Sequence, residues 1–185
     1  NAVLGGIDFL NQDPDRLLEM RLNFYLRGLN KTEDPKAENE LVGPNGEIVG
    51  RVKNGRPKFF PDYYVIPMSL DKDNDAQEAF NMIDYFKRNG VLVKELKEDI
   101  GNYKKGDLVI DMAQAKRGYA NHILYKGSNE SAWAAMYAEL LVNFPDMRGF
   151  KSEPVFADGL FNGKLGEVTT TRATRTSEID PKAPY

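Results

Sequence analysis

Several residue types that enzymes use for metal binding or covalent catalysis are rare or absent in this sequence. The 185 residues include no cysteine and a single histidine, His122. The absence of cysteine excludes disulfides, thiolate metal sites and a cysteine nucleophile. One histidine excludes a site built from several imidazole ligands and leaves one candidate base for a Ser–His–Asp triad. We therefore expect this chain alone to be neither a metalloenzyme nor a self-sufficient hydrolase.

Long apolar runs and a strong charge of either sign are also missing. No stretch approaches the roughly 20 apolar residues that a membrane-spanning helix needs, and the first residues lack the charged-then-apolar pattern of a signal peptide. The 25 basic and 28 acidic residues give a net charge of −3. Because they are interspersed along the chain, we expect neither a membrane span nor a nucleic acid partner.

The residues that are present favour one ordinary domain with an attached arm. The hydrophobic content of 41% is enough for a core. Asn1-Ala2 resembles the remnant of a cleaved tag, so we expect the chain to be a piece of a longer protein. We divide the rest into a helix and hairpin arm (3–55), an α/β domain (56–150), and a tail or the start of a following repeat (151–185). The repeat is proposed because 180–185 resembles 56–63.

The arm is predicted from capping and turn residues. Asp13 is a plausible N-cap, Pro14 suits the first helical position, and apolar residues at helical spacing follow up to Gly28. The turn residues at 44–46 and 54–55 predict a small hairpin.

The centre of the chain predicts alternating strands and helices. Apolar runs at 63–67, 91–93 and 108–110 read as strands, and helices are expected at 76–88 and 115–124. Strand, helix and strand in succession predict a βαβ unit with parallel strands. We therefore expect an α/β fold with a small, mostly parallel sheet and layers like those of class I glutamine amidotransferases. A further helix from Ser131 to before Pro145 and an edge strand at 168–171 complete the expected elements.

Several segments carry a resemblance to a known family. The densest are DMAQAKRGYAN at 111–121 and NFPDMRGF at 143–150, and GGIDF at 5–9 and FYLRG at 24–28 add to them. With these segments the chain resembles the region after the catalytic domain in large bacterial zinc carboxypeptidases of the carboxypeptidase A-like clan. The similarity covers most of residues 3–156, and its weaker parts are 64–67, 79–86, 89–91 and 136–139.

The resemblance implies a parent protein that hydrolyses peptides, secreted or held at the cell surface. In that family zinc is bound by an H-x-x-E pair and a later histidine, and a further glutamate is the general base. None of these residues can be placed in this chain, so no catalytic residue and no metal ligand is assigned. Zinc would belong to the absent catalytic domain. The resemblance thus implies a non-catalytic accessory region whose partners are its own catalytic domain and, through the parent, the peptide substrate.

A second function class remains open, because a ligand site is conceivable at the loop after the third strand. Ligands of open α/β sheets bind where strands end, and free N–H groups at a helix start can hold an anion. This would make the chain an independent peptide-, glycan- or anion-binding module. Alternatively, the same residues cap the turn and contact the neighbouring catalytic domain or solvent. The candidate ligand-binding or interdomain residues are Asp111, Gln114, Lys116, Arg117 and Asn121.

Three other features have a functional and a plain interpretation. His122 is a base or a surface or half-buried histidine, and no G-x-S-x-G motif accompanies it. The alternating carboxylates at 71–75 resemble a calcium loop, but the glycine and glutamate that such a loop requires are Ala76 and Met82 here, so we read a turn. The aromatic residues at 59–64 form either a stacking surface or part of a core or interface.

Overall fold

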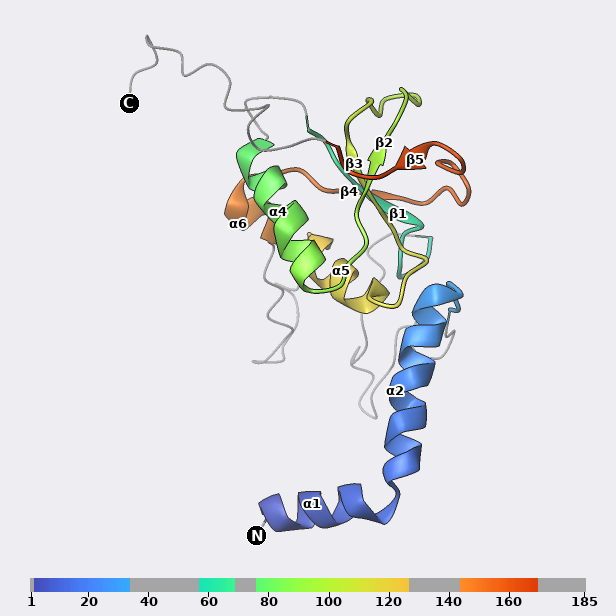
Figure 1. Ribbon diagram of the computed structural model, residues 1–185, viewed down its shortest axis with the longest axis vertical. Helices are drawn as coiled ribbons and strands as arrows, with labels where there is room; N and C mark the ends of the chain where they lie inside the picture. The colour runs from blue at the N-terminus through green and yellow to red at the C-terminus, as the bar shows by residue number, and fades with distance from the viewer. Residues whose placement is uncertain (1, 34–56, 69–75, 127–143, 170–185) are drawn as a thin grey trace, which may run out of the picture.

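The computed structural model describes residues 2–33, 57–68, 76–126 and 144–169. These residues form an arm of two helices and a unit built around a five-stranded sheet. Figure 1 shows the arm extending away from the sheet unit, with its first helix at the far end. The helices are α1 (Ala2–Gln12), α2 (Pro14–Leu29), α4 (Ala76–Arg88), α5 (Arg117–Leu124) and α6 (Phe144–Arg148), and the strands are β1 (Tyr63–Ile66), β2 (Lys94–Leu96), β3 (Leu108–Asp111), β4 (Glu153–Val155) and β5 (Leu165–Gly166).

The sheet is antiparallel throughout, so the predicted mostly parallel sheet is wrong. Its strand order is β4-β1-β3-β2-β5, and each neighbouring pair is antiparallel. Since β1 and β2 both run antiparallel to β3, they run in the same direction, but β3 separates them. The expected βαβ unit is therefore split, and the layers of class I glutamine amidotransferases do not describe this sheet.

The short connection between β2 and β3 explains the antiparallel pairing. Parallel neighbours need a crossover of about a dozen residues or more, usually a helix, whereas residues 97–107 join these strands directly. Gly101 and Gly106 have φ of 57° and 95°, and Ile100 and Tyr103 form a bridge inside the connection. The connection is therefore a hairpin, and it inserts β3 beside β2 before α5 begins.

Burial on both faces of the sheet explains why the strands resembled those of a parallel sheet. Tyr64 and Ile66 belong to a core cluster on the side of α4 and α5, whereas Tyr63 and Val65 belong to a second cluster on the opposite face. Continuous apolar strands are typical of parallel sheets that helices cover on both sides. Here the second face is covered by side chains from connecting segments, including Phe161.

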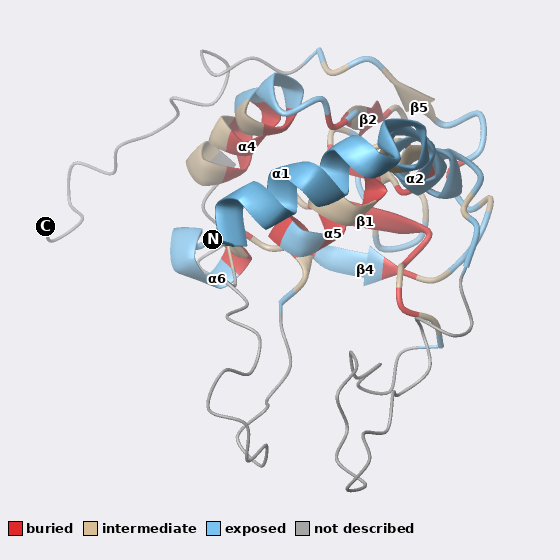
Figure 2. Cartoon of the chain, turned by 90° about the horizontal axis from the view of Figure 1, so that it is seen from below, coloured by how far each residue is buried: buried red, intermediate tan, exposed pale blue. Residues whose placement is uncertain are grey.

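Helix α4 follows its predicted pattern. Ala79, Phe80, Ile83 and Phe86 are buried against the sheet, as expected for an apolar stripe of helical period. Figure 2 shows this buried side in red, in contrast to the pale blue arm. The helix is followed by Gly90, whose φ of 74° suits the end of a helix.

The remaining expectations have mixed outcomes. Helix α2 is confirmed, and the Asp13 carboxylate accepts a hydrogen bond from the Arg16 N–H at 3.1 Å. Helix α1 was not predicted from apolar spacing or capping residues, β2 begins three residues later than expected, and α6 contains Pro145. Strands β4 and β5 come from beyond residue 150, the expected end of the domain. The hairpin at 44–55, the carboxylates at 71–75, the helix from Ser131 and the repeat at 180–185 lie outside the described residues.

Candidate functional site

The loop that follows β3 is closed by its own hydrogen bonds. The Asp111 carboxylate accepts a hydrogen bond from the Ala113 N–H at 2.8 Å. The Gln114 side chain, 2% exposed, accepts from the Leu92 N–H at 2.9 Å and donates to the Asp111 carbonyl at 2.6 Å. Gln114 therefore joins this loop to the segment before β2, because a buried amide of this kind needs partners on both its oxygen and its nitrogen.

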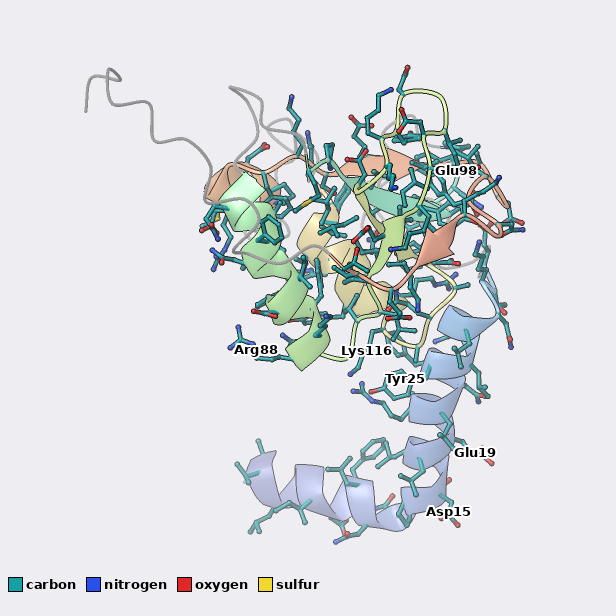
Figure 3. The ribbon with its side chains drawn as sticks, turned by 45° about the horizontal axis from the view of Figure 1, so that its top comes forward. Asp15, Glu19, Tyr25, Arg88, Glu98 and Lys116 are labelled. Carbon is teal, nitrogen blue, oxygen red and sulfur yellow. The ribbon has the colours of Figure 1, made fainter. Side chains whose placement is uncertain are left out.

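Lys116, at the end of the loop, and Arg117, the first residue of α5, both contact the arm. The buried Arg117 donates a hydrogen bond to the Thr32 carbonyl at 2.7 Å, and its guanidinium lies 4.3 Å from the centre of the Phe60 ring. The Lys116 ammonium lies 5.4 Å from the ring of Tyr25 on α2, and Figure 3 labels both residues on the facing sides of loop and helix. Cations over aromatic rings are attracted to the ring face. The contacts of Arg117 with Thr32 and of Lys116 with Tyr25 help to fix α2 against the sheet unit.

Two glycines allow α2 to approach the sheet unit closely. A Cβ atom at Gly28 would lie 2.4 Å from the Gln114 carbonyl oxygen, and one at Gly118 of α5 would lie 3.0 Å from the Phe24 ring. Since no Cβ fits within 3 Å of a backbone oxygen, the helix could not keep this position with alanine at residue 28. The sequence pattern gave Gly28 only the role of ending a helix, whereas the structure gives it a packing role.

Lys31 forms a second contact between arm and sheet unit. Its ammonium lies 2.8 Å from the Asp158 carboxylate, 3.8 Å from that of Asp62 and 3.9 Å from that of Asp111. Burial disfavours the charged form of Lys31, but the hydrogen bond to Asp158 and the charge of Asp111 outweigh it and raise its pKa. The pKa of the exposed Asp158 is lowered, mainly by the same hydrogen bond and then by the charge of Lys31. The sequence offered no signal for this cluster, because its members are far apart in the chain.

Asn121 and His122 have different surroundings although they are neighbours in the chain. Asn121 is 1% exposed and accepts a hydrogen bond from the Tyr64 hydroxyl at 2.9 Å. His122 is exposed. The aromatic segment is largely internal too, since Phe59, Tyr63 and Tyr64 are buried. The five candidate residues are therefore not gathered around one ligand site: four lie at the contact of loop and arm, and Asn121 lies in the core.

A surface that the sequence interpretation missed covers the arm. Helix α1 has no buried residue, and in α2 the side chains of Leu18, Leu22 and Leu26 are 64%, 60% and 49% exposed. Soluble monomers rarely present a contiguous apolar surface of several hundred Å² without a binding role. The other exposed apolar residues of the arm are Val3, Leu4, Ile7, Phe9, Leu10, Met20, Phe24 and Leu29.

In the part of the chain that the structure describes, no three histidine, cysteine, aspartate or glutamate side chains are grouped so that they could hold a metal ion. None of the described helices is long and apolar enough to span a membrane.

Comparison with known proteins adds no relative. No family model, no curated protein and no solved structure matches the chain.

Proposed function

We propose that this chain is a non-catalytic accessory region of a secreted bacterial zinc carboxypeptidase, and that it docks on the catalytic domain through α1 and α2. The observation that supports this proposal is the exposed apolar surface of the arm. Exposed apolar side chains are present on both helices of the arm, and a standard protein interface buries roughly 800 Å² per partner.

The resemblance supplies the partner. Two segments of the arm, 5–9 and 24–28, resemble the helix that follows the last catalytic segment in large bacterial zinc carboxypeptidases. The catalytic domain would therefore lie beside α1 and α2, and the peptide substrate would be bound there. The sheet unit, through Arg117, Lys31 and the close approach at Gly28, holds α2 at a fixed angle for this contact.

The contacts of the loop after β3 do not favour an independent binding module. Gln114 and Arg117, which were candidates for either a ligand site or an interdomain contact, use polar groups to join the loop to the β2 segment and to the arm. A ligand at this loop would have to displace α2. We therefore keep the accessory role as the single proposal.

The test is association of the 185-residue chain with the catalytic domain of a carboxypeptidase from the resembled family, measured by sedimentation velocity. We expect a one-to-one complex that Leu22→Asp weakens at least tenfold, because it places a charge in the apolar contact. Leu92→Asp is the matched control, since Leu92 is 61% exposed on the sheet unit and Leu22 is 60% exposed on the arm. No association, or equal weakening by both variants, contradicts the proposal.

A peptidase assay tests the non-catalytic part of the proposal. The purified chain should hydrolyse no peptide with or without added zinc, while the catalytic domain should keep its activity when the chain is bound. Stoichiometric zinc in the purified chain together with peptide turnover would show that the chain is itself the enzyme.

A further inference from the structure

Two Asn-Gly pairs within the described residues are alike in sequence and in solvent exposure. Asn89-Gly90 follows α4, and Asn162-Gly163 lies in the connection between β4 and β5 (Figure 1). All four residues are exposed, and the two glycines have φ of 74° and 72°. Because both pairs are open to water, a difference in their chemistry must come from the hydrogen bonds around them.

Asparagine is a chemically labile residue, above all when glycine follows it. The backbone nitrogen of the glycine loses its proton, attacks the side-chain carbon Cγ of the asparagine and forms a C–N bond. The bond from Cγ to Nδ2 breaks, and the leaving nitrogen takes up a proton and departs as ammonia. Water then opens the resulting succinimide ring to aspartate or to isoaspartate. Glycine favours the attack because it has no Cβ atom beside the nitrogen.

Both reacting groups of the pair after α4 are held by hydrogen bonds. The Asn89 side chain donates from Nδ2 to the Tyr85 carbonyl at 2.8 Å. The Gly90 N–H donates to the Lys87 carbonyl at 3.1 Å. The nitrogen and the side-chain carbon must leave these partners before they can form a ring, and each hydrogen bond that opens adds to the barrier.

The same two groups of the pair between β4 and β5 are not held in this way. The Asn162 backbone N–H donates to the Gly159 carbonyl at 3.1 Å and so fixes the turn. Within the described ranges, neither the Asn162 side chain nor the Gly163 N–H makes a hydrogen bond. A Cβ atom at Gly163 would have no neighbour within 4 Å, so the attacking residue is also uncrowded.

We propose that Asn162 is a site of spontaneous deamidation in the folded chain and that the hydrogen bonds at Asn89 protect the matching pair. In the folded chain, Asn89 should react at least about tenfold more slowly than Asn162, because two hydrogen bonds must open first. The reaction needs only water as a co-reactant. It is therefore independent of the proposed accessory role and of any partner.

The modification would alter the segment that covers the second face of the sheet. Phe161 is 1% exposed, and its ring centre lies 4.9 Å from that of Tyr63 and 5.4 Å from that of Tyr103. Isoaspartate at residue 162 adds a carbon atom to the main chain directly after Phe161, and it also adds one negative charge. Because packed cores tolerate little displacement, the modified chain should unfold at a lower denaturant concentration.

The experiment is incubation of the full 185-residue chain in a mildly alkaline buffer, folded in one sample and unfolded in guanidinium chloride in another. Trypsin places the two asparagines in separate peptides, 89–94 and 152–164, and neither peptide contains another asparagine. Mass spectrometry follows the conversion of each asparagine with time. We expect similar rates in the unfolded chain and early conversion of peptide 152–164 alone in the folded chain. Asn162→Gln is the control and should abolish this conversion.

Each outcome decides the proposal. An unmodified Asn162 in the folded chain overturns it, and so does a rate for Asn89 that equals or exceeds that of Asn162. Anion exchange then separates the modified chain by its added negative charge. Urea denaturation of that fraction should give a midpoint below that of the fresh chain. An unchanged midpoint contradicts the proposed effect on the packing of Phe161.

Discussion

The arm and the sheet unit differ in how their apolar residues are used. In the sheet unit, both faces of β1 are buried, and α4 and α5 cover one of them. In the arm, Leu18, Leu22 and Leu26 of α2 and the whole of α1 are exposed, although these leucines have the helical spacing that α4 uses to bury its apolar side. Apolar spacing predicts that a helix will bury one side. It does not say whether the covering surface belongs to the same chain.

The largest effect that this comparison predicts is on the free energy of unfolding of the sheet unit. Phe86→Ala removes a ring that is 0% exposed in α4 and should lower the free energy of unfolding by about 3–5 kcal/mol. Phe9→Ala, at a ring that is 69% exposed in α1, should change it by less than about 0.5 kcal/mol. Urea denaturation followed by circular dichroism measures both. Similar losses in the two variants would mean that α1 packs against the sheet unit.

The next effect concerns the junction of the two regions. Gly28→Ala places a Cβ atom 2.4 Å from the Gln114 carbonyl oxygen, so α2 must move, at a cost of about 1–3 kcal/mol. We expect amides 24–29 to lose protection from hydrogen exchange while β1 and β3 keep theirs. Gly5→Ala, in the same arm but with open space at its Cβ position, is the control and should leave amides 24–29 unchanged. Unchanged protection in Gly28→Ala would rule out the close approach of α2.

The sequence contained enough information for the local elements and too little for their arrangement. The spacing of Ala79, Ile83 and Phe86 was sufficient to predict α4, and Asp13 with Pro14 was sufficient to predict the start of α2. The strand order could not be read from the sequence, and an unbroken apolar run such as 63–66 is compatible with a parallel or an antiparallel neighbour. The length of the connection at 97–107 was the available signal for a hairpin.

The candidate site shows the same division. Asp111 and Gln114 were predicted to lie where β3 ends, and they do. Their partners, Leu92 for Gln114 and Lys31 of the arm for Asp111, could not be predicted, because contacts between distant segments follow from the packing of the whole chain. Apolar spacing did not reveal helix α1, because its two glycines lower helix propensity and because the stronger capping residue, Asp13, comes after it in the chain.

A smaller effect separates the two neighbours Asn121 and His122. Asn121→Ala removes the acceptor of the buried hydrogen bond from Tyr64 and should lower the free energy of unfolding by about 1–2 kcal/mol. His122→Ala changes an exposed side chain and should stay within about 0.5 kcal/mol. Thermal unfolding of the two variants under one buffer condition makes the comparison. If His122→Ala lowered the free energy of unfolding more than Asn121→Ala, the side chain of His122 would have to make a stabilising contact, contrary to its exposed position.

The smallest effect is a pKa change inside the sheet unit, between α4 and α5. The hydroxyls of Tyr85 and Tyr119 lie 2.7 Å apart. The pKa of Tyr119 is raised from 10.0 to about 12. Burial is the largest cause, followed by the hydrogen bond with Tyr85 and the charge of Tyr85. Because the folded state holds this proton more tightly than the unfolded state, the resulting stabilisation is complete below pH 10 and is lost as the pH rises from 10 towards 12.

Removing the partner hydroxyl should shift this titration without disturbing the arm. In Tyr85→Phe the burial of Tyr119 remains but its hydrogen bond is lost, so its pKa should fall from about 12 towards the ordinary 10.0. The measurement is an ultraviolet titration of phenolate absorbance, with Tyr119→Phe as the control that should remove the most alkaline step. If Tyr85→Phe leaves that step in place, burial alone sets the pKa. The loss of stability between pH 10 and 12 would then belong to the packing of α4 against α5 rather than to the pair of hydroxyls.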